Sequence, residues 1–307
     1  MSKTSYFGFA VLAGLAVTGA RAQAQQQKQP PSLSVRPIKE GAVYWLAGGG
    51  GNTGVVIGQT GVVVIDAKTT PEFGKLVVDE VAKLTPKPIT HVILTHSDGD
   101  HVNGLTAFPA GINIIAHENN KKEQQMTFLY AAVEVDGGRC LPPADRLPTQ
   151  VVAQDNVSAK IDGVSFVFRY FGPAHTSGDL VVYLPDYKLA FAGDLLTSNV
   201  LVHTEKFGSL DGWFKNARGL LALDAETYVG GHADAVDTKA GVQKRIDGYQ
   251  AMRDKVDALM KENKSLAEIK TAMGDPAKSP SGCRGIPYLS FAEVEYQAQT
   301  DKTQQIK

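Results

Sequence analysis

The stretch Thr95-His96-Ser97-Asp98-Gly99-Asp100-His101 places two histidines and two aspartates within six residues. It directly follows the apolar segment His91–Leu94, which predicts a strand. A loop that leaves the end of a strand can direct several side chains at one point, because its backbone is not held to a single period. Imidazole and carboxylate suit zinc, iron or manganese. The stretch therefore predicts part of a metal site, the alternative being an exposed polar loop in which Asp100 caps a helix.

Three later segments repeat the arrangement of an apolar strand followed by a possible ligand close to glycine. The possible ligands are His175, Asp194 and His232. The carboxyl ends of strands are where ligand sites of α/β sheets gather. A single histidine after a strand is more often a hydrogen-bonded structural residue, so the prediction depends on the whole set.

Short apolar segments alternate with helical stretches from about residue 42 onward. We expect strands at Ala42–Leu46, Gly54–Ile57, Val62–Ile65, His91–Leu94, Asn113–Ala116, Val164–Phe171, Leu180–Leu184, Leu189–Ala192 and Thr227–Val229. We expect helices at Pro71–Leu84, Glu118–Ala132, Leu210–Leu223, Thr238–Met260, Leu266–Met273 and Phe291–Thr300. The Gly- and Pro-containing segment Glu134–Thr149 is interpreted as a loop that borders a substrate site. The alternation predicts a layered α/β domain.

The first residues have the pattern of a secretory signal peptide. A lysine, Lys3, precedes an apolar run from Tyr6 to Ala20, and small residues flank Arg21 and Gln23. The run is short for a membrane span, so cleavage is expected, and an uncleaved anchor is the alternative. The predicted organisation is a signal peptide at 1–24, a flexible spacer at 25–38, the main domain at 39–240 and a C-terminal helical extension of it at 241–307. Export predicts a periplasmic or secreted protein without stable membrane insertion.

Composition and charge narrow the class of partner. The chain has 307 residues, of which 43% are hydrophobic and 21% charged, with a formal net charge of −1. These values are typical of a globular protein, and the absence of a basic run argues against a nucleic-acid partner. Cys140 and Cys283 are the two cysteines. In an oxidising compartment they either form a disulfide or remain two buried thiols.

The order and spacing of the possible ligands resemble the metallo-β-lactamase superfamily, over about Ala42 to Ala235. The first motif of that family is usually written H-x-H-x-D-H. The resemblance implies an α/β fold, a four-layer αβ/βα sandwich, with two divalent metal ions, zinc being favoured, in a groove at one edge. It implies that one ion is held by His96, Asp98 and His175. The second ion would be held by Asp100, His101 and His232, with Asp194 bridging the two.

Asp98 departs from this pattern, because it stands where the usual motif has a second histidine. An aspartate can bind a metal but adds a negative charge, which favours harder ions such as iron or manganese relative to zinc. Flavodiiron proteins, a redox branch of the superfamily, carry glutamate there, but no flavodoxin-like domain follows in this chain. Asp194 stands where many zinc β-lactamases have cysteine, which resembles the glyoxalase II-like branch instead.

We therefore expect an exported binuclear metal-dependent hydrolase that acts on a small-molecule substrate. It would cleave an ester-like bond (a thioester, lactone, β-lactam or related bond) by a metal-bridging hydroxide, with Asp100 shuttling the proton. The alternatives are a di-iron redox protein of the same fold and a non-catalytic metal-binding protein. Other side chains are interpreted as structural, packing or solvated: Lys68, His91, His117, Tyr130, His203 and Lys206. For His203, in the loop of residues 201–206, the alternative is contact with substrate.

Overall fold

The computed structural model describes residues 31–126, 146–197, 202–275 and 289–300. The predicted signal peptide, Cys140, Cys283, Tyr130 and most of the loop predicted at Glu134–Thr149 lie outside the described residues. The described residues belong to one compact unit that begins at Pro31.

The first sheet contains strands from the first half of the chain, in the order β1-β2-β3-β4-β5-β6-β7. They are β1 Ser34–Lys39, β2 Val43–Ala47, β3 Thr53–Ile57, β4 Val62–Ile65, β5 Ile89–Ile93, β6 Asn113–His117 and β7 Gln150–Val152. Strands β1 to β4 pair antiparallel, and β4 to β7 pair parallel. Helix α1, Pro71–Leu84, makes the crossover from β4 to β5, with Thr70 as its N-cap and Pro71 in its first turn. The parallel part therefore aligns the carboxyl ends of β4, β5 and β6 at one edge.

The second sheet contains strands from the second half, in the order β12-β11-β10-β9-β8. They are β8 Val157–Ile161, β9 Val164–Arg169, β10 Val181–Leu184, β11 Leu189–Gly193 and β12 Thr227–Gly230. Only the β11–β12 pair is parallel, and helix α5, Leu210–Ala222, lies between these two strands in the sequence. Both strands thus end at the same edge, where Asp194 and His232 follow them.

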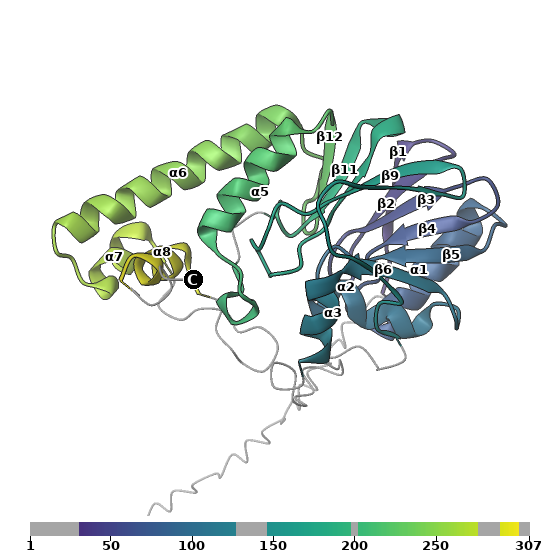
Figure 1. Ribbon diagram of the computed structural model, residues 1–307, viewed down its shortest axis with the longest axis horizontal. Coiled ribbons are helices and arrows are strands. Elements are labelled where there is room, and N and C mark those ends of the chain that lie inside the picture. The colour runs from purple at the N-terminus through teal and green to yellow at the C-terminus, as the bar shows by residue number, and fades with distance from the viewer. Residues whose placement is uncertain (1–30, 127–145, 198–201, 276–288, 301–307) are drawn as a thin grey trace, which may run out of the picture. The chain divides into compact units, whose positions relative to one another are not determined.

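The two sheets pack face to face between two layers of helices (Figure 1). Side chains such as Trp45, Ile93, Phe166 and Phe191 form a core between the sheets. Helix α1 packs on the outer face of the first sheet. Helices α5 and α6 (Lys239–Lys261) pack on the outer face of the second. This arrangement confirms the predicted four-layer sandwich.

Short helices complete the two halves. Helix α2, Gly99–Val102, and the 3-10 helix η1, Asn103–Ala107, follow β5, and α3, Glu118–Gln125, follows β6. The 3-10 helices η3, Pro185–Tyr187, and η4, Thr204–Lys206, lie in connections of the second half.

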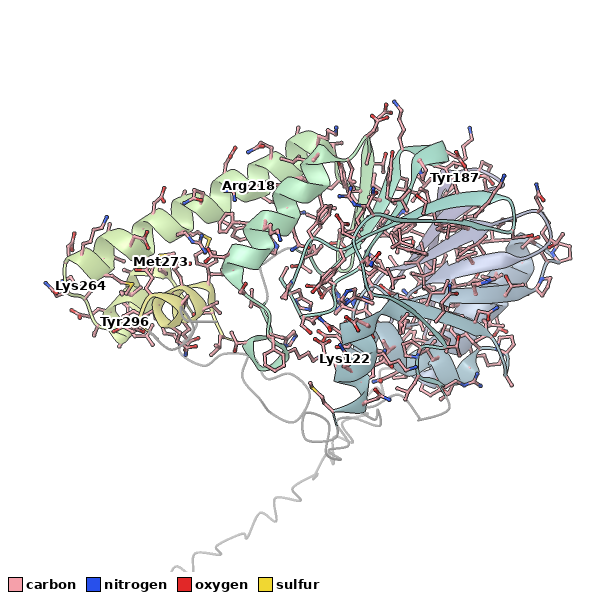
Figure 2. All side chains as sticks on the ribbon, in the orientation of Figure 1. Lys122, Tyr187, Arg218, Lys264, Met273 and Tyr296 are labelled. Carbon is pink, nitrogen blue, oxygen red and sulfur yellow. The ribbon has the colours of Figure 1, made fainter. Side chains whose placement is uncertain are left out.

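The C-terminal helices α7, Leu266–Met273, and α8, Phe291–Thr300, pack against α6 through a small apolar cluster. Figure 2 shows two of its members, Met273 and Tyr296, close to the end of α6 near Lys264. Helix α6 begins at Lys239, so the extension predicted from residue 241 starts inside a helix. Among the described residues, no helix is both long and apolar enough to cross a membrane.

Three strands, β1, β7 and β8, are not predicted from the sequence, and β1 overlaps the segment that we predict to be a flexible spacer. Residues 34–38, assigned to the flexible spacer at 25–38, belong to β1, which pairs antiparallel with β2. This strand lies at the edge of the sheet, is partly exposed and contains Pro37, so its apolar pattern is weak. Strands β7 and β8 are also missed, because one is very short and the other is polar on its outer side.

Candidate metal centre

The predicted ligands of the first motif lie on the loop and short helix that follow β5. His96 follows the strand by three residues, Asp98 is the N-cap residue of α2, and Asp100 and His101 lie within that helix. The loop is held at its base by Asp66, whose carboxylate accepts hydrogen bonds from the Thr95 amide and hydroxyl, at 2.8 and 2.7 Å. The end of β4 therefore fixes the start of the motif.

The three remote residues reach the same place from the second sheet. His175 lies in the connection between β9 and β10, Asp194 directly follows β11, and His232 follows β12 by two residues. The amide of Gly231 donates to the carbonyl of Gly193 at 2.8 Å, which joins the ends of β11 and β12. A side chain at Gly231 would collide with the Asp194 carboxylate, because its Cβ would lie 1.9 Å from Oδ1. Glycine there leaves room for the carboxylate to face the histidines.

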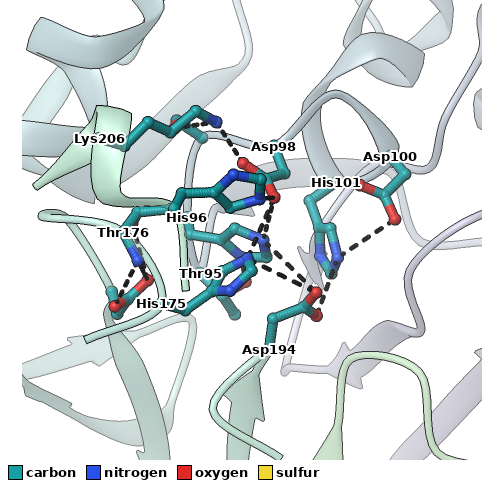
Figure 3. A network of polar contacts seen from close by, with 12 residues as sticks. Thr95, His96, Asp98, Asp100, His101, His175, Thr176, Asp194 and Lys206 are labelled. Atoms are coloured by element: carbon teal, nitrogen blue, oxygen red, sulfur yellow. Dashed lines mark hydrogen bonds and ion pairs between the residues drawn. The ribbon is translucent and has the colours of Figure 1, made fainter. Parts of the chain in front are cut away.

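The structure brings all seven predicted ligands together in one cluster at the edge of both sheets, and Figure 3 shows most of them. Three groups have potential ligand atoms within 4.8 Å of one another. They are His96, Asp98 and His175; His96, His101 and Asp194; and Asp100, His101 and His232. The first and third groups are the two ligand sets that the family resemblance implies. Asp194 lies between them, with His101 Nε2 at 3.2 Å from Oδ1 and His232 Nε2 at 3.3 Å from Oδ2.

Three buried atoms of the cluster make no hydrogen bond of good geometry among the described residues, although two of them, His101 Nε2 and Asp194 Oδ1, lie 3.2 Å apart as an ion pair. They are His96 Nε2, His101 Nε2 and Asp194 Oδ1. Leaving buried polar atoms unsatisfied costs about 1–3 kcal/mol each. All three face the centre of the cluster and are donor atoms that divalent metals bind. The residues present therefore fit a metal centre.

The imidazoles of His96 and His101 are oriented by contacts on the side of the ring that faces away from the cluster. His101 Nδ1 lies 2.8 Å from Asp66 Oδ2, and His96 Nδ1 lies 2.9 Å from Thr95 Oγ1. A partner on Nδ1 leaves Nε2 to face the cluster, which is how outer residues orient metal-binding histidines. Asp66 was missed by the sequence prediction, although it follows a fully buried strand, β4, as the other site residues follow theirs.

Both carboxylate oxygens of Asp98 contact nitrogen atoms of buried side chains. Oδ1 pairs with the ammonium of Lys206, while Oδ2 lies 3.0 Å from His175 Nε2 and 3.0 Å from His203 Nε2. Of the two interpretations of Lys206, solvated or packing, the first is wrong, because its ammonium is buried against this carboxylate. His203 is likewise buried beside the site. The burial of Lys206 and His203 beside Asp98 could not be predicted from the sequence, since both residues lie in a polar loop without periodicity.

A further buried acid, Glu123 of α3, lies behind Asp98. It accepts hydrogen bonds from the hydroxyls of Ser97 and Ser177, each at 2.6 Å. Ser97 belongs to the first motif and Ser177 to the His175 loop. Glu123 thus ties together the two loops that carry the first ligand set.

Lys68 corrects another expectation. It is not solvated but fully buried, and its ammonium nitrogen donates to the carbonyls of Leu46 and Gly51, each at 2.7 Å. It holds the glycine loop of residues 48–51 over the site. At Gly51 an added Cβ would lie 2.2 Å from the His101 ring, so only glycine permits this approach.

Electrostatics separates the acids from the imidazoles. Burial alone would raise the pKa of Asp98, but the charges of His203 and Lys206 outweigh it and lower the pKa well below the ordinary value. The hydrogen bonds with Asp100 and Asp194 raise the pKa of His232 to about 10. In the metal-free protein these carboxylates are thus ionised, and neighbouring acids raise the pKa of His101, His175 and His232. Metal binding has to displace protons from these histidines.

The cluster is open on one side. The side chains of His96, His101, His175 and Asp194 are at most 4% exposed, whereas those of Asp100 and His232 are 32% and 38% exposed. A substrate can therefore approach beside Asp100 and His232.

Comparisons with known proteins agree with this geometry. A family model described as "Metallo-beta-lactamase superfamily" matches residues 46–232. The alpha subunit of 2,4-dinitroanisole O-demethylase from Nocardioides sp. (strain JS1661) is 27% identical over 86% of this chain and 77% of that protein. A metallo-beta-lactamase type 2 from Bacillus sp. (strain 170) is 28% identical over 48% of this chain and 51% of its own.

Solved structures share the fold at low sequence identity. A stereoselective inverting sec-alkylsulfatase from Pseudomonas sp. has a TM-score of 0.64 at 18% identity, over 90% of this chain and 52% of that one. A metallo-beta-lactamase from Pontibacter korlensis has a TM-score of 0.58 at 18% identity, over 70% of this chain and 98% of that one. The chain thus spans about half the length of the sulfatase.

Proposed function

Because the chain belongs to the metallo-beta-lactamase superfamily, whose model matches most of both sheets, we propose that it is a binuclear metal-dependent hydrolase of ester-like bonds. Candidate bonds are those of thioesters, lactones, β-lactams and related compounds. The observation that carries the proposal is the convergence of unsatisfied histidine and aspartate atoms from both sheets on one open edge. Zinc suits this donor set, and the three carboxylates also suit iron or manganese.

Bound divalent ions supply Lewis acidity and lower the pKa of water toward neutrality. The chain's own residues do the rest. The carboxylates of Asp194 and Asp100 lie beside the exposed imidazole of His232, at 3.3 and 3.0 Å from its Nε2. Asp100 lies at the open side, and in the metal-free protein the His101 charge and the His232 hydrogen bond outweigh burial and lower its pKa, so it is a carboxylate. Asp100 can therefore take the proton that an attacking water loses and return it to the leaving atom.

The proposal also covers the branch of the superfamily and the location of the protein. Asp194 in place of a cysteine supports a relation to the glyoxalase II-like branch. The pattern of the first 24 residues supports export to the periplasm or the medium.

Cleavage of an aryl ether is a second candidate reaction. It is favoured by the similarity to the alpha subunit of 2,4-dinitroanisole O-demethylase, which extends over 86% of this chain. A substrate panel of a thioester, a lactone, a β-lactam, an alkyl sulfate and 2,4-dinitroanisole separates the two reactions.

Elemental analysis of the purified protein, followed by that panel, tests the proposal. We expect about two metal ions per chain, and loss of metal and turnover in H96A and H232A. D100N should lower turnover by about 10²–10⁴-fold, because it removes the proton acceptor. H91A is the matched control, since His91 lies on β5 outside the cluster and should be dispensable. Metal-free wild-type protein, or full turnover in all three site variants, would contradict the assignment.

A further inference from the structure

His203 lies where an imidazole is missing from the first ligand set. The usual motif supplies two histidines there, and this chain has His96 and Asp98. Three imidazole nitrogens nevertheless surround Asp98 Oδ2: His175 Nε2 at 3.0 Å, His203 Nε2 at 3.0 Å and His96 Nε2 at 3.6 Å. Two donors that share one zinc ion lie about 3–4 Å apart, since each bond is about 2 Å long. Each spacing from Oδ2 to a nitrogen is compatible with a shared metal position, and His203 lies beside the group of His96, Asp98 and His175, whose ligand atoms all lie within 4.8 Å of one another.

The loop that carries His203 is fixed against the His175 loop by backbone hydrogen bonds. The His203 amide donates to the His175 carbonyl at 2.8 Å, and the Ser209 amide donates to the Ala174 carbonyl at 2.8 Å. Between them, Gly208 packs so closely that an added Cβ would lie 2.4 Å from the His175 carbonyl oxygen. The two imidazole rings consequently stand edge to face, with centroids 4.8 Å apart. His203 is therefore positioned by the fold rather than by its contact with Asp98 alone.

Lys206, three residues later in the same loop, compensates the charge of Asp98. Its ammonium is buried, pairs with Asp98 Oδ1 and lies 3.2 Å from the Ser97 hydroxyl. Occupying Oδ1 leaves Oδ2 as the oxygen that faces the histidines. Aspartate at position 98 adds one negative charge relative to histidine, and Lys206 adds one positive charge beside it. One loop thus supplies both the imidazole and the cation that the change at position 98 requires.

We propose that His203 is a ligand of the first metal position, together with His96, His175 and Asp98. This inference rests on the proposed metal-dependent function and deepens it. It restores three imidazoles to the first ion, which favours zinc or cobalt over harder ions despite the added carboxylate. His203 is not among the seven predicted ligands. In this chain it would supply the imidazole that the usual motif has at position 98.

The test compares H203Q with wild type and with H91Q, in the full chain. Glutamine can still donate a hydrogen bond to Asp98, so H203Q separates a ligand from a residue that only holds the carboxylate. H91Q removes an imidazole from β5, outside the cluster, by the same substitution. Circular dichroism and thermal unfolding of the metal-free variants check that each one folds.

Zinc affinity is measured by competition with a chromophoric chelator. We expect H203Q to bind one of two zinc ions at least about 100-fold more weakly, a larger loss than the about 10–100-fold typical of outer hydrogen-bond partners. The cobalt-loaded protein gives a second readout, independent of turnover. Proton spectra of coordinated histidines show hyperfine-shifted ring N–H signals, and H203Q should lack one that wild type and H91Q retain.

The outcomes separate this inference from the proposed function. Suppose that wild type binds two zinc ions. If H203Q then binds both ions as tightly as wild type, or keeps all of the shifted N–H signals, the role of His203 alone is overturned. A wild-type chain that holds no metal would overturn the metal-dependent function and this assignment with it.

Discussion

Lys68 shows how a single buried amine can organise the approach to the site. Burial lowers the pKa of Lys68 to about 7, although the charges of Asp66 and Asp100 act in the opposite direction. Its two hydrogen bonds join the end of β2 to the glycine loop that covers His101. We expect K68M to lower the free energy of unfolding by about 2–4 kcal/mol, because two buried carbonyls lose their donor at about 1–3 kcal/mol each. Denaturant unfolding monitored by fluorescence measures this loss.

The control for that prediction is K75M, at an exposed position on α1. Lys75 pairs with Asp79 at 2.7 Å on the surface, so its removal should change stability by less than about 0.5 kcal/mol. Equal stability of the two variants would show that the Lys68 hydrogen bonds contribute nothing net.

At the scale of an element, the N-terminus of α3 depends on a neutral histidine. His117 caps this helix, with Nδ1 accepting from the Asn119 amide at 3.2 Å, and its ring stacks on Tyr170 with centroids 3.6 Å apart. Burial lowers the pKa of His117 to about 4, with Lys122 adding to the effect and Glu118 opposing it. Protonation would remove the acceptor and place a positive charge at a helix N-terminus, which is unfavourable.

This difference predicts a stability that falls with acid. The unfolded chain binds a proton near pH 6.5 and the folded chain only near pH 4, so the free energy of unfolding decreases as pH falls between those values. The full shift corresponds to about 3 kcal/mol, and solvent screening reduces it to about 2 kcal/mol. H117N keeps a capping side chain without titrating, so it should lack this part of the decrease. Parallel pH profiles of the two proteins from denaturant melts would refute the role of His117.

Elements with strong periodic patterns were predictable from the sequence, and edge elements were not. Strand β4 and helices α1 and α7 have the predicted bounds, because a buried run, a capping residue or a proline marks their ends. Strand β1 was missed because an edge strand with one exposed face needs little apolar sequence. The seven predicted ligands lie together because each follows the end of a strand, and strand ends meet at one edge of the sandwich. Glu123 was not predicted, and the burial of Lys206 against Asp98 was not predicted either, because burial of a polar side chain leaves no local pattern.

At the scale of the whole molecule, the site joins the two halves of the sandwich. His96 to His101 follow β5 of the first sheet, whereas Asp194 and His232 follow strands of the second. Within the described residues, polar bridges such as Asn52 Nδ2 to the Gly230 carbonyl, at 2.8 Å, also cross this edge. Bound metal ions would therefore tie the sheets together, and their binding free energy would add to the stability of the folded chain.

Metal removal should consequently destabilise the whole unit rather than the site alone. An ion at 100 times its dissociation constant contributes about 2.7 kcal/mol, and each kcal/mol shifts the melting temperature of a domain this large by about 2–4 °C. Two ions predict a fall of about 10 °C or more when the protein is stripped with a chelator, and recovery when zinc is added back. Differential scanning calorimetry measures both steps. H232A, which lacks one predicted ligand, should show a smaller difference between its stripped and zinc-treated forms. The contradicting outcome is a wild-type protein that carries metal but melts at the same temperature with and without the chelator. In that case the apolar core alone would hold the two sheets together, and the ions would contribute to catalysis but not to stability.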